Sequence, residues 1–396
     1  MIKQRFAVSL SAVALGAGLS LWQMPAVAAD AAPAALASPV APPSLANKAY
    51  ILIDYGTGQV LAQSNADEPL PPASMTKMMT SYIVEQALKG GRLKPDEQVR
   101  VSENAWCRGT SSESCMYLPL NGQASVMDIL RGIIVQSGND ASKAIAEHMA
   151  GSEQGFAELM NKEAARLGMT HTHFLNPTGL PAPGHASSAR DLATLARAII
   201  RDSADYYPIY AEKTFKYNGI KQGNRNALLY TDPTVDGLKT GHTSEAGYCL
   251  AASSKRGDMR LISVLFGADS VQGRADQTRA LFNWGFGNFE EATLGKADAK
   301  LANVGVRFAK DDLVPVGLAQ PWMVTVPRGQ AAKIKTTVQA QPGLQAPLAK
   351  GAVVGKVVAT LDGKPYAEQP LVTLAPVERA GFLKVTWQRL QALFFK

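Results

Sequence analysis

The stretch PPASMTKMMT, residues 71–80, places Ser74 three residues before Lys77. Apolar residues recur at helical spacing as far as Leu88, and two glycines then end the pattern, which predicts a helix over residues 74–89. Residues at i and i+3 share one face of a helix. A serine hydroxyl needs a base to become a nucleophile, and lysine serves only when neutral. The stretch therefore indicates either a nucleophile with its base or the polar start of an ordinary helix.

Two further short stretches bear on this choice. VQSGNDA, residues 135–141, holds Ser137 and Asn139 in a turn between two apolar helical segments. VDGLKTGHT, residues 235–243, holds Lys239-Thr240-Gly241 at the end of a strand pattern. Each alone is typical of an ordinary turn or an edge strand. In the order S-x-x-K, S-x-N, K-T-G they match the motif set of class A β-lactamases and penicillin-binding proteins, with Gly138 where that set has aspartate.

With these motifs the sequence resembles the low-molecular-mass penicillin-binding proteins of the D-alanyl-D-alanine carboxypeptidase type. The resemblance runs from about Ala49 to the C-terminal segment and includes ASMTKMMT, VQSGNDA, SSARDLA, NRNALL, VDGLKTGHT, GYCLAAS and MRLISV. It implies an α+β, β-lactamase/transpeptidase-like domain with its site between an antiparallel sheet and packed helices. It also implies a serine hydrolase that removes the terminal D-alanine from peptidoglycan pentapeptides and is inhibited covalently by β-lactams, with no cofactor, metal or nucleic acid.

The resemblance assigns a role to each motif residue. Ser74 would attack the carbonyl between the two D-alanines, Lys77 would accept its proton, and Ser137 would relay a proton to the leaving group. The backbone N–H groups of Ser74 and His242 would form the oxyanion hole. Lys239 would also supply the positive charge that keeps Lys77 neutral. The substrate-binding residues would be Asn139, Lys239, Thr240, Gly241, His242 and Arg225, and Arg274 would support the site.

Other interpretations of the same residues remain. A class A β-lactamase uses a glutamate on a loop, but the corresponding residues 176–191, NPTGLPAPGHASSARD, contain none. A peptidoglycan DD-endopeptidase or a non-catalytic cell-wall binding protein would keep the same fold. A Ser-His-Asp triad through His242 is disfavoured because the chain has no G-x-S-x-G elbow. His171, His173 and His185 lie in polar loop sequence and are predicted to be at the surface.

The chain divides into five predicted segments. Residues 1–29 carry Lys3 and Arg5, an apolar run and a small-residue end, the pattern of a secretory signal peptide, with a membrane anchor as the alternative. Residues 30–47 are rich in alanine, proline and serine and predict a flexible mature N-terminus. Residues 48–290 form the predicted catalytic domain, 291–375 a small β-sandwich-like domain, and 376–396 an amphipathic helix.

Within residues 48–290 the pattern opens with a hairpin, continues with helices and closes with strands and a helix. The strands are predicted near residues 49–54, 59–64, 235–239, 248–253 and 260–266, and the helices near 74–89, 126–135, 141–150, 156–167, 190–201 and 274–284. This order predicts an antiparallel sheet whose first and last strands meet, with helices packed on it.

The last twenty residues are amphipathic. On a helical wheel one face carries Leu383, Trp387, Leu390 and Phe394, and the other carries Lys384, Gln388, Arg389 and Gln391. An apolar face with basic flanks is typical of a helix that lies in a membrane interface, although a helix docked on its own protein would look similar. Together with export, this predicts a peripheral protein at the periplasmic face of the inner membrane.

Composition and cysteine usage add modest constraints. The chain of 396 residues is 46% hydrophobic, which is typical of a globular protein. Its net charge of +7 suits an anionic polymer or a membrane surface but proves neither. Cys107 and Cys115 flank a short polar loop and could form a disulfide or remain free thiols. Cys249 lies in an apolar strand pattern and is predicted to be a small core residue.

Overall fold

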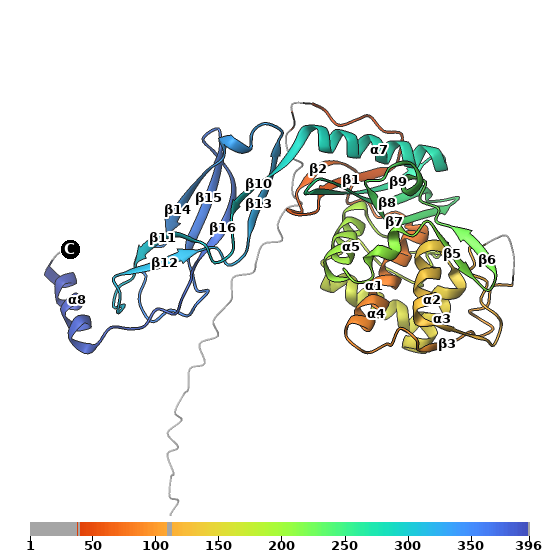
Figure 1. Ribbon diagram of the computed structural model, residues 1–396, viewed down its shortest axis with the longest axis horizontal. Helices are drawn as coiled ribbons and strands as arrows, with labels where there is room; N and C mark the ends of the chain where they lie inside the picture. The colour runs from red at the N-terminus through yellow and green to blue at the C-terminus, as the bar shows by residue number, and fades with distance from the viewer. Residues whose placement is uncertain (1–37, 39, 109–112, 395–396) are drawn as a thin grey trace, which may run out of the picture. The chain divides into compact units, whose positions relative to one another are not determined.

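The computed structural model describes residues 38, 40–108 and 113–394 (Figure 1). The predicted signal peptide, residues 1–29, lies outside the described residues, as does most of the predicted N-terminal segment before residue 40. No helix in the described part of the chain has the length and apolar character needed to cross a membrane. The predicted segment boundaries stay predictions.

A five-stranded antiparallel sheet organises the first part of the chain. Its strands are β1 (Ala49–Asp54), β2 (Val60–Ser64), β7 (Val235–Thr243), β8 (Gly247–Arg256) and β9 (Met259–Ala268), in the order β2-β1-β9-β8-β7. Ala49 pairs with Phe266 and Asp54 with Leu261, so the predicted meeting of the first and last strands is confirmed. β7, which carries the Lys-Thr-Gly motif, is an edge strand of this sheet.

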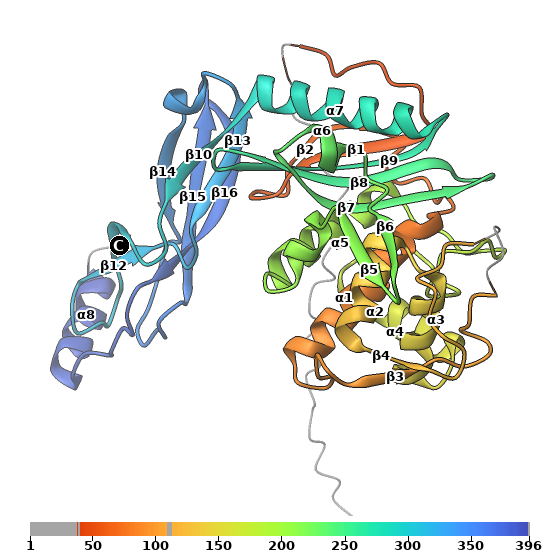
Figure 2. The same ribbon diagram turned by 45° about the vertical axis from the view of Figure 1, so that its right-hand side comes forward.

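Both faces of this sheet are apolar and both are covered. Successive side chains of a strand point to opposite faces, and on β1 Ile51 and Ile53 join one buried cluster whereas Leu52 joins another. The Leu52 face packs against α7 (Val271–Asn288). The opposite face carries the helical layer of α1 (Lys77–Lys89), α2 (Val126–Arg131), α3 (Asn139–Ala150), α4 (Glu153–Arg166) and α5 (Ala189–Asp202) (Figures 1 and 2).

Several elements differ from the predicted ones. The predicted helix near 126–135 is α2 followed by a π-helical turn, Gly132–Gln136, which leaves Ser137 in the left-handed region at φ 61°. A Cβ on Gly132 would lie 2.1 Å from Met116 Sδ, so any larger residue there would require the Met116 side chain to move. The hairpins β3–β4 (Gln98–Arg100, Gln123–Ser125) and β5–β6 (Thr214–Tyr217, Ile220–Gly223) and the short α6 (Leu228–Thr231) were not predicted. Short 3-10 turns span Tyr207–Ala211 and Ala331–Lys333.

The residues after α7 form an all-β domain, as predicted. β10 (Phe289–Gly295) pairs with β13 (Trp322–Pro327), and a second sheet has the order β11-β12-β16-β15-β14. Its strands are Lys300–Gly305, Leu313–Gly317, Lys364–Thr373, Val353–Leu361 and Lys335–Ala340 in that order. Inward-facing valines dominate the core of this domain, among them Val316, Val324, Val326, Val354 and Val357.

The chain continues into α8 (Phe382–Phe394), the predicted terminal helix. Lys384 Nζ lies 2.9 Å from Asp312 Oδ1, and Gln388 Oε1 accepts a hydrogen bond of 2.8 Å from the backbone N–H of Phe308. The polar face therefore contacts the β-domain. On the other side Leu383 and Trp387 are 83% and 62% exposed. The side chain of Phe394 lies outside the described residues.

One helix position buries an acid. Glu85 on α1 is fully buried, and its carboxylate accepts a hydrogen bond of 2.8 Å from Tyr210 Oη. Its second oxygen, Oε2, has no hydrogen-bond partner among the described residues. Desolvation by burial raises the pKa of Glu85 to about 7. The folded protein therefore binds a proton that the unfolded chain releases at lower pH.

This buried acid predicts a pH-dependent stability. Between the ordinary pKa of 4.5 and the folded value of about 7, the folded state binds more protons, so Glu85 lowers the unfolding free energy as pH rises. We expect Glu85→Gln to gain about 3 kcal/mol relative to the parent protein between pH 4 and pH 8. Urea unfolding at both pH values measures this. Glu158→Gln, at an exposed position of α4, is the matched control. If the unfolding free energies of Glu85→Gln and the parent protein differ by the same amount at pH 4 and pH 8, the prediction is contradicted.

Candidate active site

Ser74 and Lys77 meet at the junction of two helical turns. A 3-10 turn spans Ala73–Thr76, and α1 begins at Lys77, so the predicted continuous helix from residue 74 is wrong in its first turn. Lys77 is fully buried, and its Nζ lies 3.0 Å from Ser74 Oγ. The same Nζ donates to Asn139 Oδ1 at 2.7 Å and to the carbonyl of Thr178 at 2.6 Å. These contacts hold Lys77 Nζ in place, and one of them is to the candidate nucleophile, Ser74 Oγ.

The loop after α4 holds this junction in place. Gly179 sits at φ +81°, and a Cβ there would lie 1.8 Å from the carbonyl oxygen of Ala73, so glycine permits the close approach. Thr76 Oγ1 lies 2.9 Å from His185 Nε2. The prediction that His185 is at the surface is wrong, because its ring is buried edge-on against Phe174. Burial lowers the pKa of His185 to about 4, so it is a neutral structural group at pH 7.

The Ser-Gly-Asn turn joins the helical layer to β7. Ser137 Oγ accepts a hydrogen bond of 2.9 Å from Lys239 Nζ, and the Lys239 side chain is buried. Asn139 begins α3 and reaches Lys77 on one side and Glu113 on the other, with Nδ2 3.0 Å from Glu113 Oε2. The three motifs are therefore linked by direct contacts: Lys77 to Ser74 and Asn139, and Lys239 to Ser137.

β7 lies across the site from the helical layer and passes close to the 3-10 turn Ala73–Thr76, which carries Ser74. A Cβ on Gly241 would lie 2.9 Å from the carbonyl oxygen of Pro72, which explains why glycine follows Lys239-Thr240. The ring of His242 stacks on Tyr248, with centroids 4.1 Å apart. Among the described hydrogen bonds, Ser74 Oγ contacts Lys77 and no histidine. This arrangement does not support a Ser-His-Asp triad.

Two arginines border the site. Arg225 is exposed at the cleft and its guanidinium contacts Ser114 Oγ. Arg274, near the start of α7, is buried and donates to the carbonyls of Gly241 at 3.1 Å and Arg225 at 3.4 Å. Arg274 therefore connects β7 with the segment that carries Arg225, which fits its predicted supporting position.

A cleft of about 710 Å³ opens over these residues. Of the predicted site residues it is lined by Ser74, Ser137, Asn139, Arg225, Thr240, Gly241 and His242. Lys77 and Lys239 are buried and reach the lining serines with their Nζ atoms. The sequence interpretation missed Glu113, Ser114, Glu245 and Tyr248, which also line the cleft. Glu113 and Ser114 have no sequence signal beyond preceding the second cysteine. Glu245 lies in the turn between β7 and β8, and Tyr248 belongs to the predicted strand 248–253.

The electrostatics suit proton transfer by Lys77. Burial, and after it the charge of Arg225, lower the pKa of Lys77 to about 7, against the opposing charges of Asp140 and Glu113. Among the neighbouring charges, Arg225 has the largest lowering effect on the pKa of Lys77. Burial, and then the charge of Lys77, lower the pKa of Lys239 well below 10.5, and its role as the neighbouring cation stays a prediction. A large fraction of Lys77 is neutral at pH 7 and can accept a proton.

A serine bonded to a buried lysine, between a helical layer and the edge strand bearing Lys-Thr-Gly, defines an active-site-serine hydrolase of the class that contains penicillin-binding proteins and class A β-lactamases. Residues 36–270 match the family model described as D-alanyl-D-alanine carboxypeptidase, and residues 289–379 match the C-terminal domain of penicillin-binding protein 5. The chain belongs to the D-alanyl-D-alanine carboxypeptidase family.

Individual relatives agree with this assignment. The chain is 44% identical to D-alanyl-D-alanine carboxypeptidase DacC of Escherichia coli (strain K12), over 89% of each chain. It is 44% identical to penicillin-binding protein 5 from Haemophilus influenzae, whose crystal structure superposes with a TM-score of 0.84 over 86% of this chain and all of that one. Penicillin-binding protein D2 from Listeria monocytogenes, solved in its ampicillin-bound form, is 30% identical, with a TM-score of 0.56 over 61% of this chain and 98% of its own.

Proposed function

We propose that this protein is a serine-type D-alanyl-D-alanine carboxypeptidase that releases the terminal D-alanine from peptidoglycan pentapeptide stems through an acyl-enzyme on Ser74. The observation that carries the proposal is the 3.0 Å contact between Ser74 Oγ and the buried Nζ of Lys77. Burial holds the pKa of that lysine at about 7, so a general base is available at neutral pH. Ser74 also lines a cleft that Arg225 borders.

In the proposed acylation, neutral Lys77 takes the Ser74 proton as Oγ attacks the carbonyl between the two D-alanines. The backbone N–H groups of Ser74 and His242 stabilise the resulting oxyanion, and one such donor typically contributes about 10²–10³ in rate. The carbon–nitrogen bond then breaks, and Ser137 relays the proton that Lys77 took to the amine of the departing D-alanine, which leaves Lys77 neutral again. Water hydrolyses the ester and restores Ser74.

The terminal carboxylate of the substrate is proposed to lie against β7. Thr240 and Gly241 line the cleft there, and Lys239 lies behind them, bonded to Ser137. An arriving carboxylate favours the protonated form of Lys239, whose pKa burial lowers in the free enzyme. Arg225 faces the same cleft and adds a second positive charge. Asn139 would hold the amide of the substrate.

Release of free D-alanine from a pentapeptide tests this function most directly. We expect stoichiometric release of one D-alanine per pentapeptide, and a stable adduct when the protein is incubated with a fluorescent penicillin. Cleavage of cross-linked dimers without D-alanine release would indicate an endopeptidase instead. Fast penicillin turnover without an adduct would indicate a β-lactamase, which residues 176–191 disfavour because they contain no glutamate. If the protein neither cleaves these substrates nor forms a penicillin adduct, it is a non-catalytic cell-wall binding protein.

We also propose that the protein is exported and associates with the periplasmic face of the inner membrane through α8. The signal-like pattern of residues 1–29 supports export. Phe382, Leu383 and Trp387 are 82%, 83% and 62% exposed, while the polar face of the same helix contacts the β-domain. An apolar face directed to solvent with aromatic residues fits a membrane interface.

Removal of residues 382–396 is expected to abolish this membrane association. We expect the partition of the protein onto vesicles of phosphatidylethanolamine and phosphatidylglycerol to fall by at least about tenfold, because the apolar face of α8 is lost. Turnover of a small peptide should not change, since the cleft lies in residues 74–274. Vesicle sedimentation measures the partition. A matched triple variant, Phe382→Ser, Leu383→Ser and Trp387→Ser, keeps the polar contacts. Sedimentation of either variant at the parent level would exclude α8 as the anchor.

A further inference from the structure

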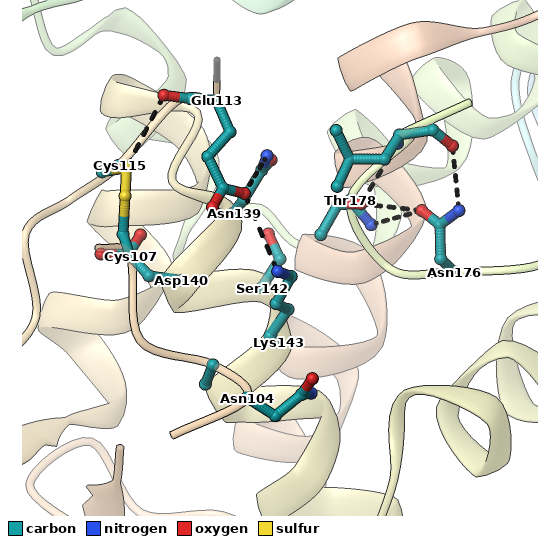
Figure 3. Close-up of polar contacts among 12 residues, drawn as sticks. Asn104, Cys107, Glu113, Cys115, Asn139, Asp140, Ser142, Lys143, Asn176 and Thr178 are labelled. Carbon is teal, nitrogen blue, oxygen red and sulfur yellow. Dashed lines mark hydrogen bonds and ion pairs between the residues drawn. A yellow bond between two sulfur atoms is a disulfide. The ribbon is translucent and has the colours of Figure 1, made fainter. Parts of the chain in front are cut away.

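A disulfide closes a short loop beside the cleft. Cys107 and Cys115 are bonded, eight residues apart, and both are buried, at 5% and 4% exposure (Figure 3). The sequence left open whether these cysteines pair. Glu113 and Ser114, the last two residues of this loop before Cys115, line the cleft. The disulfide therefore lies directly behind a stretch of the cleft wall to which none of the sequence motifs belongs.

Glu113 contacts a motif residue from this wall. Its Oε2 accepts a hydrogen bond of 3.0 Å from Asn139 Nδ2, and Lys143 Nζ lies 3.8 Å from the same oxygen (Figure 3). The side chains of Glu113 and Lys143 are only 19% and 17% exposed. A carboxylate can only accept hydrogen bonds, so the NH₂ of Asn139 must face Glu113. The amide oxygen of Asn139 then points to Lys77 Nζ, 2.7 Å away.

Hydrogen bonds hold the backbone at Cys115 and at the residues directly before and after it. The backbone N–H of Asn139 donates to the carbonyl of Ser114 at 2.7 Å, and Gln222 Nε2 donates to the carbonyl of Cys115 at 3.0 Å. The backbone N–H of Met116 donates to the carboxylate of Asp140 at 2.8 Å. Ser114 also contacts Arg225. The segment 113–116 thus joins the start of α3, the β5–β6 hairpin and the cleft arginine.

We propose that Glu113 is a positioning residue for acyl transfer: it fixes the side-chain amide of Asn139 with its oxygen on Lys77, and the Cys107–Cys115 disulfide holds Glu113 in place. The proposal rests on the proposed function, since it assigns Glu113 a part in the acylation of Ser74. Without Glu113 the amide of Asn139 can rotate by 180°, which would present NH₂ to Lys77 Nζ and remove the oxygen that now accepts its hydrogen bond.

The charge of Glu113 gives the proposal an independent signature. Lys77 is faced by Arg225 and by Lys143, which disfavour its protonated form, and by Asp140 and Glu113, which favour it. Lys239 lies on β7 on the other side, and His185 is neutral because burial lowers its pKa to about 4. Removing the negative charge of Glu113 should therefore lower the pKa of Lys77. A group that only supported the fold would not move this titration.

Two substitutions separate the charge from the hydrogen bond. Glu113→Gln keeps an acceptor for Asn139 and loses the charge, so we expect acylation by penicillin within about twofold of the parent at pH 8.5, with the acid limb of its pH profile moved to lower pH. Glu113→Ala loses both, so we expect the same shift and an acylation rate about tenfold lower at pH 8.5. Stopped-flow acylation from pH 5 to pH 9 provides both readouts.

The disulfide is tested with the double variant Cys107→Ser and Cys115→Ser. We expect it to reduce the acylation rate as Glu113→Ala does, and to have little further effect when the two are combined, because both act through Asn139. Cys249→Ser, which changes the buried thiol of β8, is the matched control. Melting curves of every variant show whether the fold is kept. If the double cysteine variant unfolds, Glu113→Gln still tests the role of Glu113.

The outcomes are distinct. Parent-like rates and pH profiles for both Glu113 variants would overturn the positioning role. If the double cysteine variant is folded and acylates at the parent rate while Glu113→Ala is slower, the part assigned to the disulfide is overturned. If the parent protein forms no penicillin adduct and releases no D-alanine, the proposed function fails first, which is a different result from an active parent with unaffected variants.

Discussion

Ser74→Ala is expected to abolish both D-alanine release and the penicillin adduct. Without Oγ no ester can form, so we expect kcat to fall by about 10⁶, the size of the loss when the nucleophile of a serine hydrolase is removed. Substrate binding should persist, because Thr240, Gly241 and Arg225 still line the cleft. D-alanine release and intact-mass analysis after penicillin treatment measure the two losses.

The matched control for this substitution is Ser263→Ala. Ser263 is a buried serine on β9 that does not line the cleft, and its Oγ has no hydrogen-bond partner among the described residues. Its removal should leave both activities at the parent level. A penicillin adduct on the Ser74→Ala protein, located by peptide mapping at another residue, would refute the assignment of the nucleophile.

Lys77→Met is expected to have the second largest effect. The substitution keeps the length of the side chain and removes the base, so acylation should slow by about 10²–10⁴. Because Asn139 Oδ1 and the Thr178 carbonyl lose their donor, some loss of stability is also expected. Penicillin acylation rates, with melting curves to confirm folding, measure both consequences.

A second lysine serves as the comparison for Lys77→Met. Lys143→Met removes a positive charge from the same helical layer without touching Ser74, and its Nζ lies 3.8 Å from Glu113. It should change the acylation rate at pH 8.5 far less than Lys77→Met does. Comparable losses for the two variants would mean that Lys77 acts through general electrostatics and not as the proton acceptor.

Much of the fold was predictable because its strands and helices are strongly periodic. β1 alternates between two buried clusters, and α5 and α1 have continuous apolar faces, so their positions and the pairing of β1 with β9 followed from pattern. The β5–β6 hairpin was missed because no strand face in it is fully buried. α6 is four residues long and gives no period.

The candidate site was predictable as far as its motifs reached. Ser74, Ser137 and Asn139 lie around the cleft in the predicted arrangement, although their catalytic roles stay predictions. Glu113 could not be found from sequence, because its contact with Asn139 spans 26 residues and lies beside a disulfide that the sequence left undecided. The burial of His185 depends on packing against Phe174, which the polar composition of its loop concealed.

Burial acts on both lysines of the site. The Lys-Thr-Gly motif and the family resemblance suggested that Lys239 would be the cation that keeps Lys77 neutral. In the structure both lysines are buried, so desolvation disfavours the charge on each of them, and Arg225 at the open cleft keeps its charge at lower cost. Which of two cations stays charged depends on solvent access, and the order of motifs along the chain does not contain that information.

The protonation state of Lys77 is the quantity on which the proposed mechanism depends most directly. The measurement is the second-order rate of Ser74 acylation by a penicillin, followed from pH 5 to pH 11. Because the pKa of Lys77 is about 7, we expect the rate to rise through an apparent pKa close to that value and then level off by about pH 8.5. A rate that continued to rise towards the ordinary lysine pKa near 10.5, or that showed no acid limb, would contradict a neutral Lys77 as the base.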